Sequence, residues 1–175
     1  FSYSIFCYTA SMIVEKTTQV GDPIIRTKAV EVTDIQSVAT KKIITDLVDS
    51  MRHHQLVGMA APQIGEGLQI FVSEIRATKL RKQSSESDIS DLKVFINPQL
   101  ISSSEEQISG WEGCGSVAEA SLFAHVTRSL SVVVVAHDEN GDTFELEATG
   151  LLARVIQHEI DHLNGIIFTD TADMK

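Results

Sequence analysis

Cysteine is scarce in this chain of 175 residues, which contains only Cys7 and Cys114. Two cysteines form at most one disulfide bridge, so the sequence excludes a secreted scaffold built on disulfides and favours a reducing compartment. Long apolar runs are also missing, since none approaches the roughly 20 residues that a membrane-spanning helix needs. Residues 1–11 are aromatic and apolar but lack a basic segment, which makes them a poor signal peptide.

Positively charged residues are also few. The chain has 14 Lys and Arg against 24 Asp and Glu, giving a net charge of −10. An acidic surface repels nucleic acids and anionic lipids, so we expect no specific nucleic-acid partner and no membrane partner. The length predicts a single catalytic domain over residues 12–175. We expect residues 1–11 to be a poorly ordered N-terminal extension or a cloning remnant.

Hydrophobic periodicity predicts one helix in the first half of the chain. Between residues 37 and 54, apolar residues recur at three- and four-residue intervals with charged residues between them. The next stretch, residues 56–67, holds three glycines and Pro62, which favours a loop. Residues 68–75 are predicted to form a strand, and the polar residues 76–92 a mobile insertion.

Strand signals dominate the second half. Four consecutive valines mark the strongest one, and an Asp-Glu-Asn-Gly-Asp turn joins it to a partner. A last helix should stop at Asn164-Gly165. The predicted strands are residues 93–101, 108–111, 131–137 and 143–148, and the predicted helix is residues 150–163. This combination predicts an α+β fold with antiparallel sheet.

Two histidines stand four residues apart in that last helix. A helix advances about 100° per residue, so His158 and His162 share one face and can direct ring nitrogens at one metal ion. Glu159 lies beside them with a carboxylate that can accept a proton from water. The His-Glu-x-x-His pattern therefore indicates metal-assisted hydrolysis. The alternative is an ordinary helix with one buried and one exposed histidine.

A catalytic metal site usually has three protein ligands, so a third is needed. Cys114 stands between two glycines, and a thiolate with two imidazoles suits zinc or another late first-row divalent ion. Taken alone, Cys114 is better explained as a small buried apolar residue. Glu112, two residues away, either orients a ligand histidine or is a surface carboxylate.

Three segments that occur in order narrow these choices. They are GMAAPQ at residues 58–63, EGCGS at residues 112–116 and HEIDH at residues 158–162. Together they closely resemble the three motifs of the peptide deformylases, and the resemblance covers most of residues 20–168. It implies an α+β fold in which antiparallel β-sheets surround the helix that carries His-Glu-x-x-His.

The resemblance also implies a reaction, which is removal of the formyl group from the N-terminal formylmethionine of newly made polypeptides, with release of formate. Cys114, His158 and His162 would bind one divalent ion, natively Fe²⁺, with Zn²⁺ or Ni²⁺ as possible substitutes. Glu159 would act as general base and then as general acid.

Further roles concern the oxyanion and the substrate. The Gln63 side-chain amide and the Gly115 backbone N–H would stabilise the oxyanion that forms during the reaction. Residues on the ligand face of the helix and at the first motif would form an apolar slot for the methionine side chain, although core packing also explains the two on the helix. These residues are Val57, Gly58, Leu151 and Val155. N-formylmethionyl nascent peptides would be the substrate, with transient ribosome contact, in a bacterial cytoplasm or an organelle of bacterial origin.

The chain departs from the family pattern at three places. Leu56 stands where the first motif usually has a glycine, Gly115 stands where many members have leucine, and residues 117–128 lack the usual Pro-Gly turn. Gly115 and the altered segment 117–128 motivate a second hypothesis, a metal-binding relative that has lost catalysis and serves as a binding protein. A third hypothesis is a zinc peptidase that uses the same helix and cleaves internal peptide bonds.

Overall fold

An antiparallel five-stranded sheet forms the centre of the fold, in a computed structural model that describes residues 16–78 and 89–172. Its spatial order is β1-β2-β3-β6-β7, and β4 pairs with β5 in a separate antiparallel sheet. The strands are β1 (Gly58–Ala60), β2 (Ile70–Ile75), β3 (Ser90–Ser103), β4 (Gln107–Gly113), β5 (Phe123–Ser129), β6 (Ser131–His137) and β7 (Thr143–Thr149). The expected extension at residues 1–11 lies outside the described residues.

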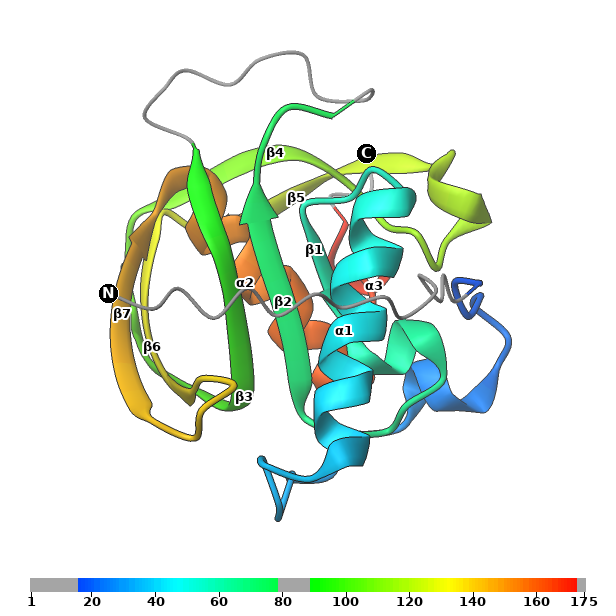
Figure 1. The fold of residues 1–175 in the computed structure, drawn as a ribbon. Coiled ribbons are helices and arrows are strands. Elements are labelled where there is room, and N and C mark those ends of the chain that lie inside the picture. The colour runs from blue at the N-terminus through cyan, green and yellow to red at the C-terminus, as the bar shows by residue number, and fades with distance from the viewer. Residues whose placement is uncertain (1–15, 79–88, 173–175) are drawn as a thin grey trace.

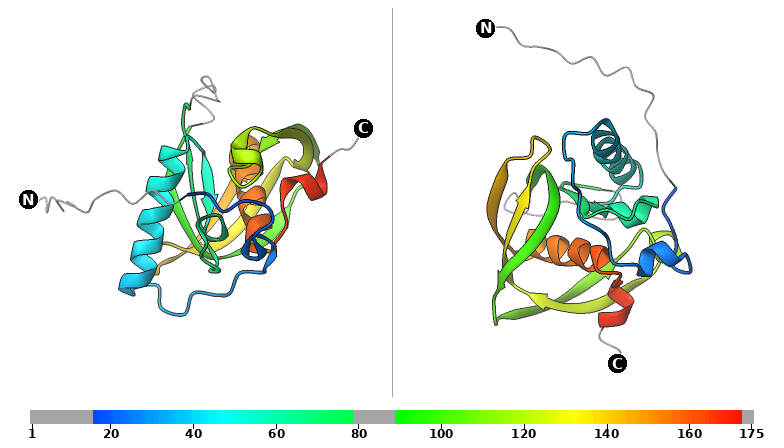
Figure 2. Two further views of the ribbon diagram at one scale, coloured as in Figure 1. Left: turned by 90° about the vertical axis from the view of Figure 1, so that its right-hand side faces the viewer. Right: turned by 90° about the horizontal axis from the view of Figure 1, so that it is seen from below.

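Two helices cover opposite faces of the large sheet, α1 (Val38–His53) and α2 (Gly150–Leu163), as Figures 1 and 2 show. Alternate residues of β2 serve the two faces, because successive side chains of a strand point in opposite directions. Ile70 and Val72 pack in the apolar cluster that includes Leu47 of α1. Phe71 packs in a second cluster with Ile156 of α2.

Helix α1 forms where the periodicity predicts it. Ser37 caps its start, because the Ser37 hydroxyl accepts a hydrogen bond from the Thr40 N–H at 3.0 Å. The apolar stripe is buried against the sheet and includes Ile43, Leu47 and Met51. The predicted helix over residues 37–54 is therefore confirmed.

Helix α2 lies between the five-stranded sheet and the β4–β5 pair (Figure 2), and its sheet-facing side is apolar. It ends as predicted at Asn164-Gly165. Gly165 has a φ of +74°, which favours glycine, and its N–H donates to the His162 carbonyl at 3.1 Å. A Cβ atom there would lie 2.5 Å from the Arg26 carbonyl oxygen, so both conformation and space demand glycine.

One segment predicted as an irregular loop contains a strand, so that prediction was wrong. Residues 56–67 hold the short strand β1 and the 3₁₀ helix η2 (Ala61–Ile64). β1 has three residues, all buried, so it shows no alternation of polar and apolar residues. Residues 117–128, for which no element was predicted, hold the 3₁₀ helix η4 (Ala118–Ala120) and most of β5.

The polar insertion expected at residues 76–92 is shorter than predicted, because β3 already begins at Ser90. Residues 79–88 lie outside the described part of the chain. Short helical segments complete the structure, namely η1 (Pro23–Arg26) and α3 (Phe168–Thr171). No helix within the described ranges has the length and apolar character that a membrane span requires.

Candidate active site

The three predicted metal ligands meet at one end of a cavity beside α2. Cys114 directly follows β4, and His158 and His162 lie one turn apart on α2. Their ligand atoms all lie within 4.8 Å of one another, and Cys114 Sγ is 3.1 Å from His162 Nε2. One sulfur and two imidazole nitrogens form a donor set that fits a late first-row divalent ion. The site therefore has the chemistry of a metal centre.

The charges around the Cys114 thiol favour its metal-binding form. Burial acts to raise the pKa of this thiol, but His162 and His158 hold the pKa well below the ordinary value of 9.0. Burial also acts to lower the pKa of His158, whereas hydrogen bonds to Cys114 and Glu112 raise that pKa well above 6.5. The cluster thus stabilises a thiolate, which is the form that binds a metal ion.

Glu159 is buried beside this cluster, with 3% of its surface exposed. Burial raises the pKa of Glu159 to about 7, although His158 and His162 act to lower it. Its Oε2 atom has no hydrogen-bond partner among the described residues, and Glu159 lines the cavity. A carboxyl group with a pKa near neutrality and a free oxygen can both accept and donate a proton.

Gln63 reaches the cluster from η2. Its Oε1 atom accepts a hydrogen bond from the Ala60 N–H at 2.8 Å, which directs the Nε2 group toward Cys114 Sγ at 3.4 Å. Gly115 follows Cys114 and is also buried. The predicted residues Gln63 and Gly115 therefore lie next to the thiol, and the Gln63 amide donates a hydrogen bond to it.

A buried network of charges supports His158 from behind. The Glu112 carboxylate accepts hydrogen bonds from His158 Nδ1 at 2.9 Å and from Arg128 Nε and Nη2, each at 3.0 Å. Arg154 Nη1 donates to the same carboxylate at 2.7 Å, and Arg128 also pairs with Asp161. Because Nδ1 is engaged by Glu112, Nε2 is the nitrogen of His158 left for the metal cluster.

This network resolves the alternative that the sequence leaves open for Glu112. Glu112 is not a surface carboxylate, because 5% of its side chain is exposed. Burial acts to raise the pKa of Glu112, but His158 and Arg128 lower it to about 2. Asp161 belongs to the same network as a partner of Arg128. Arg154 lines the cavity and donates to the carbonyls of Val126 and Ile108, so it does not extend freely into solvent.

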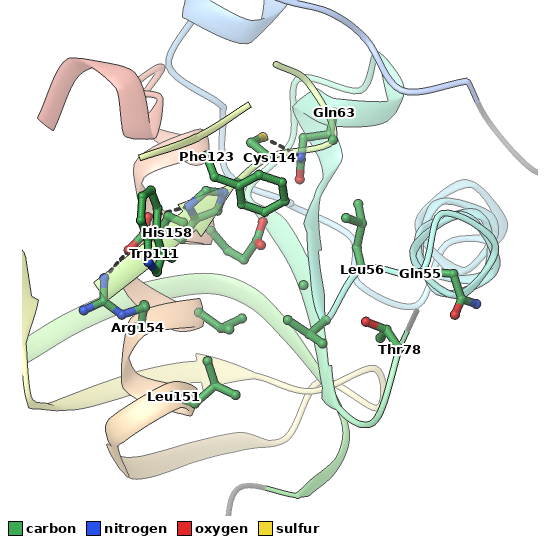
Figure 3. A pocket seen from close by; sticks show the side chains of 17 residues that line it. Gln55, Leu56, Gln63, Thr78, Trp111, Cys114, Phe123, Leu151, Arg154 and His158 are labelled. Carbon is green, nitrogen blue, oxygen red and sulfur yellow. Dashed lines mark hydrogen bonds and ion pairs between the residues drawn. The ribbon is translucent and has the colours of Figure 1, made fainter. Parts of the chain in front are cut away.

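A cavity of about 400 Å³ opens beside the cluster (Figure 3). All four residues predicted for the methionine slot line it, with Leu151 and Val155 on α2 and Val57 and Gly58 at β1. Several lining residues were not predicted: Gln55, Leu56, Thr78, Trp111 and Phe123. These residues follow α1 or lie on or beside strands, and they belong to no sequence motif. Only the fold brings them to the cavity, so the sequence carried no signal for them.

The chain matches the family model described as polypeptide deformylase over residues 14–175. The peptide deformylase of Dictyoglomus thermophilum is 37% identical over 160 residues, covering 91% of this chain and 94% of that protein. The chain belongs to the polypeptide deformylase family. The chloroplastic/mitochondrial peptide deformylase 1A of Arabidopsis thaliana is 39% identical and aligns with 86% of this chain and 58% of its own length.

Solved deformylase structures share this fold. The class I type b peptide deformylase from Acinetobacter baumannii, bound to Met-Ala-Ser, superposes with a TM-score of 0.85 at 27% identity, covering 92% of this chain and 99% of that chain. The predicted family, fold class and enzyme class are confirmed. So is the predicted activity, that of a hydrolase which deformylates new polypeptides.

Gly58 allows Glu159 to approach the strand β1. A Cβ atom at residue 58 would lie 2.4 Å from Glu159 Oε1 and 2.8 Å from Val155 Cγ1. We expect Gly58→Ala to displace the carboxylate and to lower kcat for deformylation by about 10²-fold, as misplacement of a reacting group by about 1 Å does. Gly67→Ala is the control, because a Cβ atom there would meet nothing within 4 Å. Equal kcat values for the two variants would contradict this account of Gly58.

The buried carboxylate of Glu112 is expected to stabilise the fold. Glu112→Ala leaves Arg128 and Arg154 buried without their shared anion, and breaking a buried ion pair costs about 3–5 kcal/mol. Urea denaturation should show a loss of that size in the free energy of unfolding. The exposed Glu105 provides the matched control, Glu105→Ala, for which we expect almost no change. A small effect for both variants would show that the network contributes little to stability.

Proposed function

We propose that Cys114, His158 and His162 hold one divalent ion in this deformylase, with Fe²⁺ as the native ion and Zn²⁺ or Ni²⁺ as substitutes. The compact donor set of one thiolate and two imidazoles supports this assignment. Affinity rises from Fe²⁺ toward Ni²⁺ and Zn²⁺ in the usual order, so replacement of iron during handling is expected. When bound, the ion polarises the formyl carbonyl and lowers the pKa of water.

Glu159 is proposed to move the protons. Its carboxylate accepts a proton from water as the water oxygen bonds to the formyl carbon, and it then donates that proton to the departing amine nitrogen. The C–N bond breaks, formate leaves and a free amino terminus remains. The single observation that carries this proposal is the buried Glu159 carboxyl at the metal cluster, whose Oε2 atom has no hydrogen-bond partner among the described residues.

Two N–H groups are proposed to stabilise the oxyanion. Gln63 Nε2 and the Gly115 backbone N–H flank Cys114, and donors set in place before the reaction stabilise developing negative charge without reorganising. The Ala60 N–H fixes the Gln63 amide by donating to Oε1. This arrangement directs the formyl oxygen to the side of the cavity formed by residues 63 and 115.

The methionine side chain of the substrate is proposed to occupy the apolar part of the cavity. Leu151 and Val155 form one wall, and Val57 and Gly58 form the other. We also propose that the enzyme encounters formylated nascent peptides during transient contact with the ribosome. We expect no specific nucleic-acid or membrane partner. The acidic net charge of −10 supports the absence of those two partners.

We place the protein in a bacterial cytoplasm or in an organelle of bacterial origin. The relatives support both locations, because one is bacterial and another carries the name chloroplastic/mitochondrial.

Three peptides test the proposed reaction and separate it from the two other hypotheses. Iron-loaded protein should release formate from formyl-Met-Ala-Ser, and should leave acetyl-Met-Ala-Ser and unmodified Met-Ala-Ser intact by mass spectrometry. Cleavage of internal peptide bonds would instead support a zinc peptidase. Tight binding of the formylated peptide without formate release would support a binding protein that has lost catalysis.

A further inference from the structure

The space beside Gly115 is filled by side chains from other parts of the chain. A Cβ atom at residue 115 would lie 3.0 Å from Leu56 Cδ1 and 3.3 Å from Thr17 Cγ2. The φ of Gly115 is outside the left-handed region, so its backbone conformation is open to any residue. Space, rather than conformation, therefore favours glycine at residue 115, and Leu56 is the closest neighbour.

Leu56 is itself firmly placed. It follows the end of α1, where Gln55 adopts a φ of +60° and turns the chain toward β1. The Leu56 N–H donates to the Met51 carbonyl at 2.9 Å, and the Leu56 carbonyl accepts from Arg76 Nη2 at 3.0 Å. Its side chain packs against the apolar cluster under α1. These contacts therefore fix the position of Leu56 beside the Gly115 backbone.

A hydrogen bond holds the Gly115 carbonyl group. Gln19 Nε2 donates to the Gly115 carbonyl at 2.8 Å and also to Thr17 Oγ1 at 3.0 Å. Both Leu56 and Gly115 line the cavity of about 400 Å³ and a neighbouring cavity of about 310 Å³. The two residues are therefore shared by the linings of both cavities.

Glycine has more backbone freedom than any other residue, and residue 115 lies beside the thiol ligand with a further glycine at residue 113. A donor that must point at a developing charge loses effect when its peptide can rotate. We propose that Leu56 is a positioning residue for the Gly115 N–H. The Leu56 side chain lies where a side chain at residue 115 would pack, and it limits rotation of the Gly115 peptide. This inference rests on the proposed role of the Gly115 N–H as an oxyanion donor.

The same contact relates two of the departures from the family pattern. The chain has leucine at residue 56, where glycine is usual, and glycine at residue 115, where leucine is frequent. A side chain at residue 115 would enter the space that Leu56 occupies, because its Cβ atom would lie 3.0 Å from Leu56 Cδ1.

Exchanging the two residues tests the proposal on the metal-loaded protein. The set comprises Leu56→Gly, Gly115→Leu, the double variant Leu56→Gly/Gly115→Leu, and Leu56→Ala as a milder change. Leu68→Gly is the matched control, because Leu68 packs on the same apolar cluster as Leu56. The measurements are kcat and KM for formyl-Met-Ala-Ser per bound metal ion, together with the thermal midpoint.

We expect each single exchange to lower kcat by about tenfold, with a smaller change in KM, since loss of an oxyanion donor costs about 10²–10³-fold and misdirection costs less. The double variant should recover kcat to within about threefold of the parent chain and should regain most of the lost thermal midpoint. Leu56→Ala should give an intermediate kcat. Leu68→Gly should lower the thermal midpoint while leaving kcat nearly unchanged.

Independent effects would overturn the inference. If the double variant loses as much kcat as the two single changes combined, residues 56 and 115 are not coupled. If Leu68→Gly lowers kcat as much as Leu56→Gly, the effect is general loss of packing. Absence of formate release from the parent chain would contradict the proposed function and the donor role, whereas the thermal midpoints would still report whether the two side chains exchange.

Discussion

Replacing Glu159 with glutamine is expected to lower kcat for formate release by about 10²–10⁴-fold, the usual contribution of a general acid–base group. Glutamine preserves the size and most of the packing of the side chain, which is 3% exposed, but it cannot accept a proton from water. The metal should stay bound, because the three proposed ligands are unchanged. Steady-state formate release and metal analysis of the same preparation give both quantities.

A matched control for this change is Glu147→Gln on β7, where the carboxylate is exposed and remote from the cavity. Its kcat should equal that of the parent chain. Undiminished turnover in Glu159→Gln would rule out the proton transfer assigned to this residue. Loss of metal from Glu159→Gln would show that the carboxyl group helps to hold the ion.

Replacing Cys114 with alanine is expected to remove both the bound metal and the activity. The thiolate is one of three proposed ligands, and its loss leaves two histidines that cannot form a usual catalytic site. Since the ion supplies several kcal/mol of transition-state stabilisation, kcat should fall by at least about 10²-fold. Metal content after dialysis, measured by mass spectrometry, and formate release check the two effects.

Val117→Ala is a suitable control for Cys114→Ala, because both side chains belong to the same small apolar cluster. It removes packing without removing a ligand, so metal content should be retained. Circular dichroism should show that both variants keep their secondary structure. A Cys114→Ala variant that retained stoichiometric metal and full turnover would exclude Cys114 as a ligand.

The helical parts of this fold were predictable because their signals are local. Helix α1 carries an apolar stripe and a serine cap, and α2 carries the His-Glu-x-x-His spacing and a glycine stop. The spacing of His158 and His162 follows from helix geometry alone. The third ligand needed more, since only the resemblance to a family joins Cys114 to the helix.

The strand β5 was missed because one of its inward-facing residues is charged, so the sequence does not show the usual alternation of apolar and polar residues. Val126 and Arg128 are both buried, and an inward arginine looks like a solvent-facing residue in a sequence. Its burial becomes reasonable only once Glu112 and Asp161 are seen around it. Contacts between distant segments, such as Leu56 with Gly115, are likewise invisible to periodicity, because they depend on how the elements pack.

Anaerobic purification followed by metal analysis and a formate-release assay on one sample tests the central claim most directly. The account predicts about one divalent ion per chain, and formate release from formyl-Met-Ala-Ser that is lost with a chelator and restored by Fe²⁺. Formate release at the same rate from metal-free protein would contradict it, and so would a fully iron-loaded protein that leaves the formylated peptide intact.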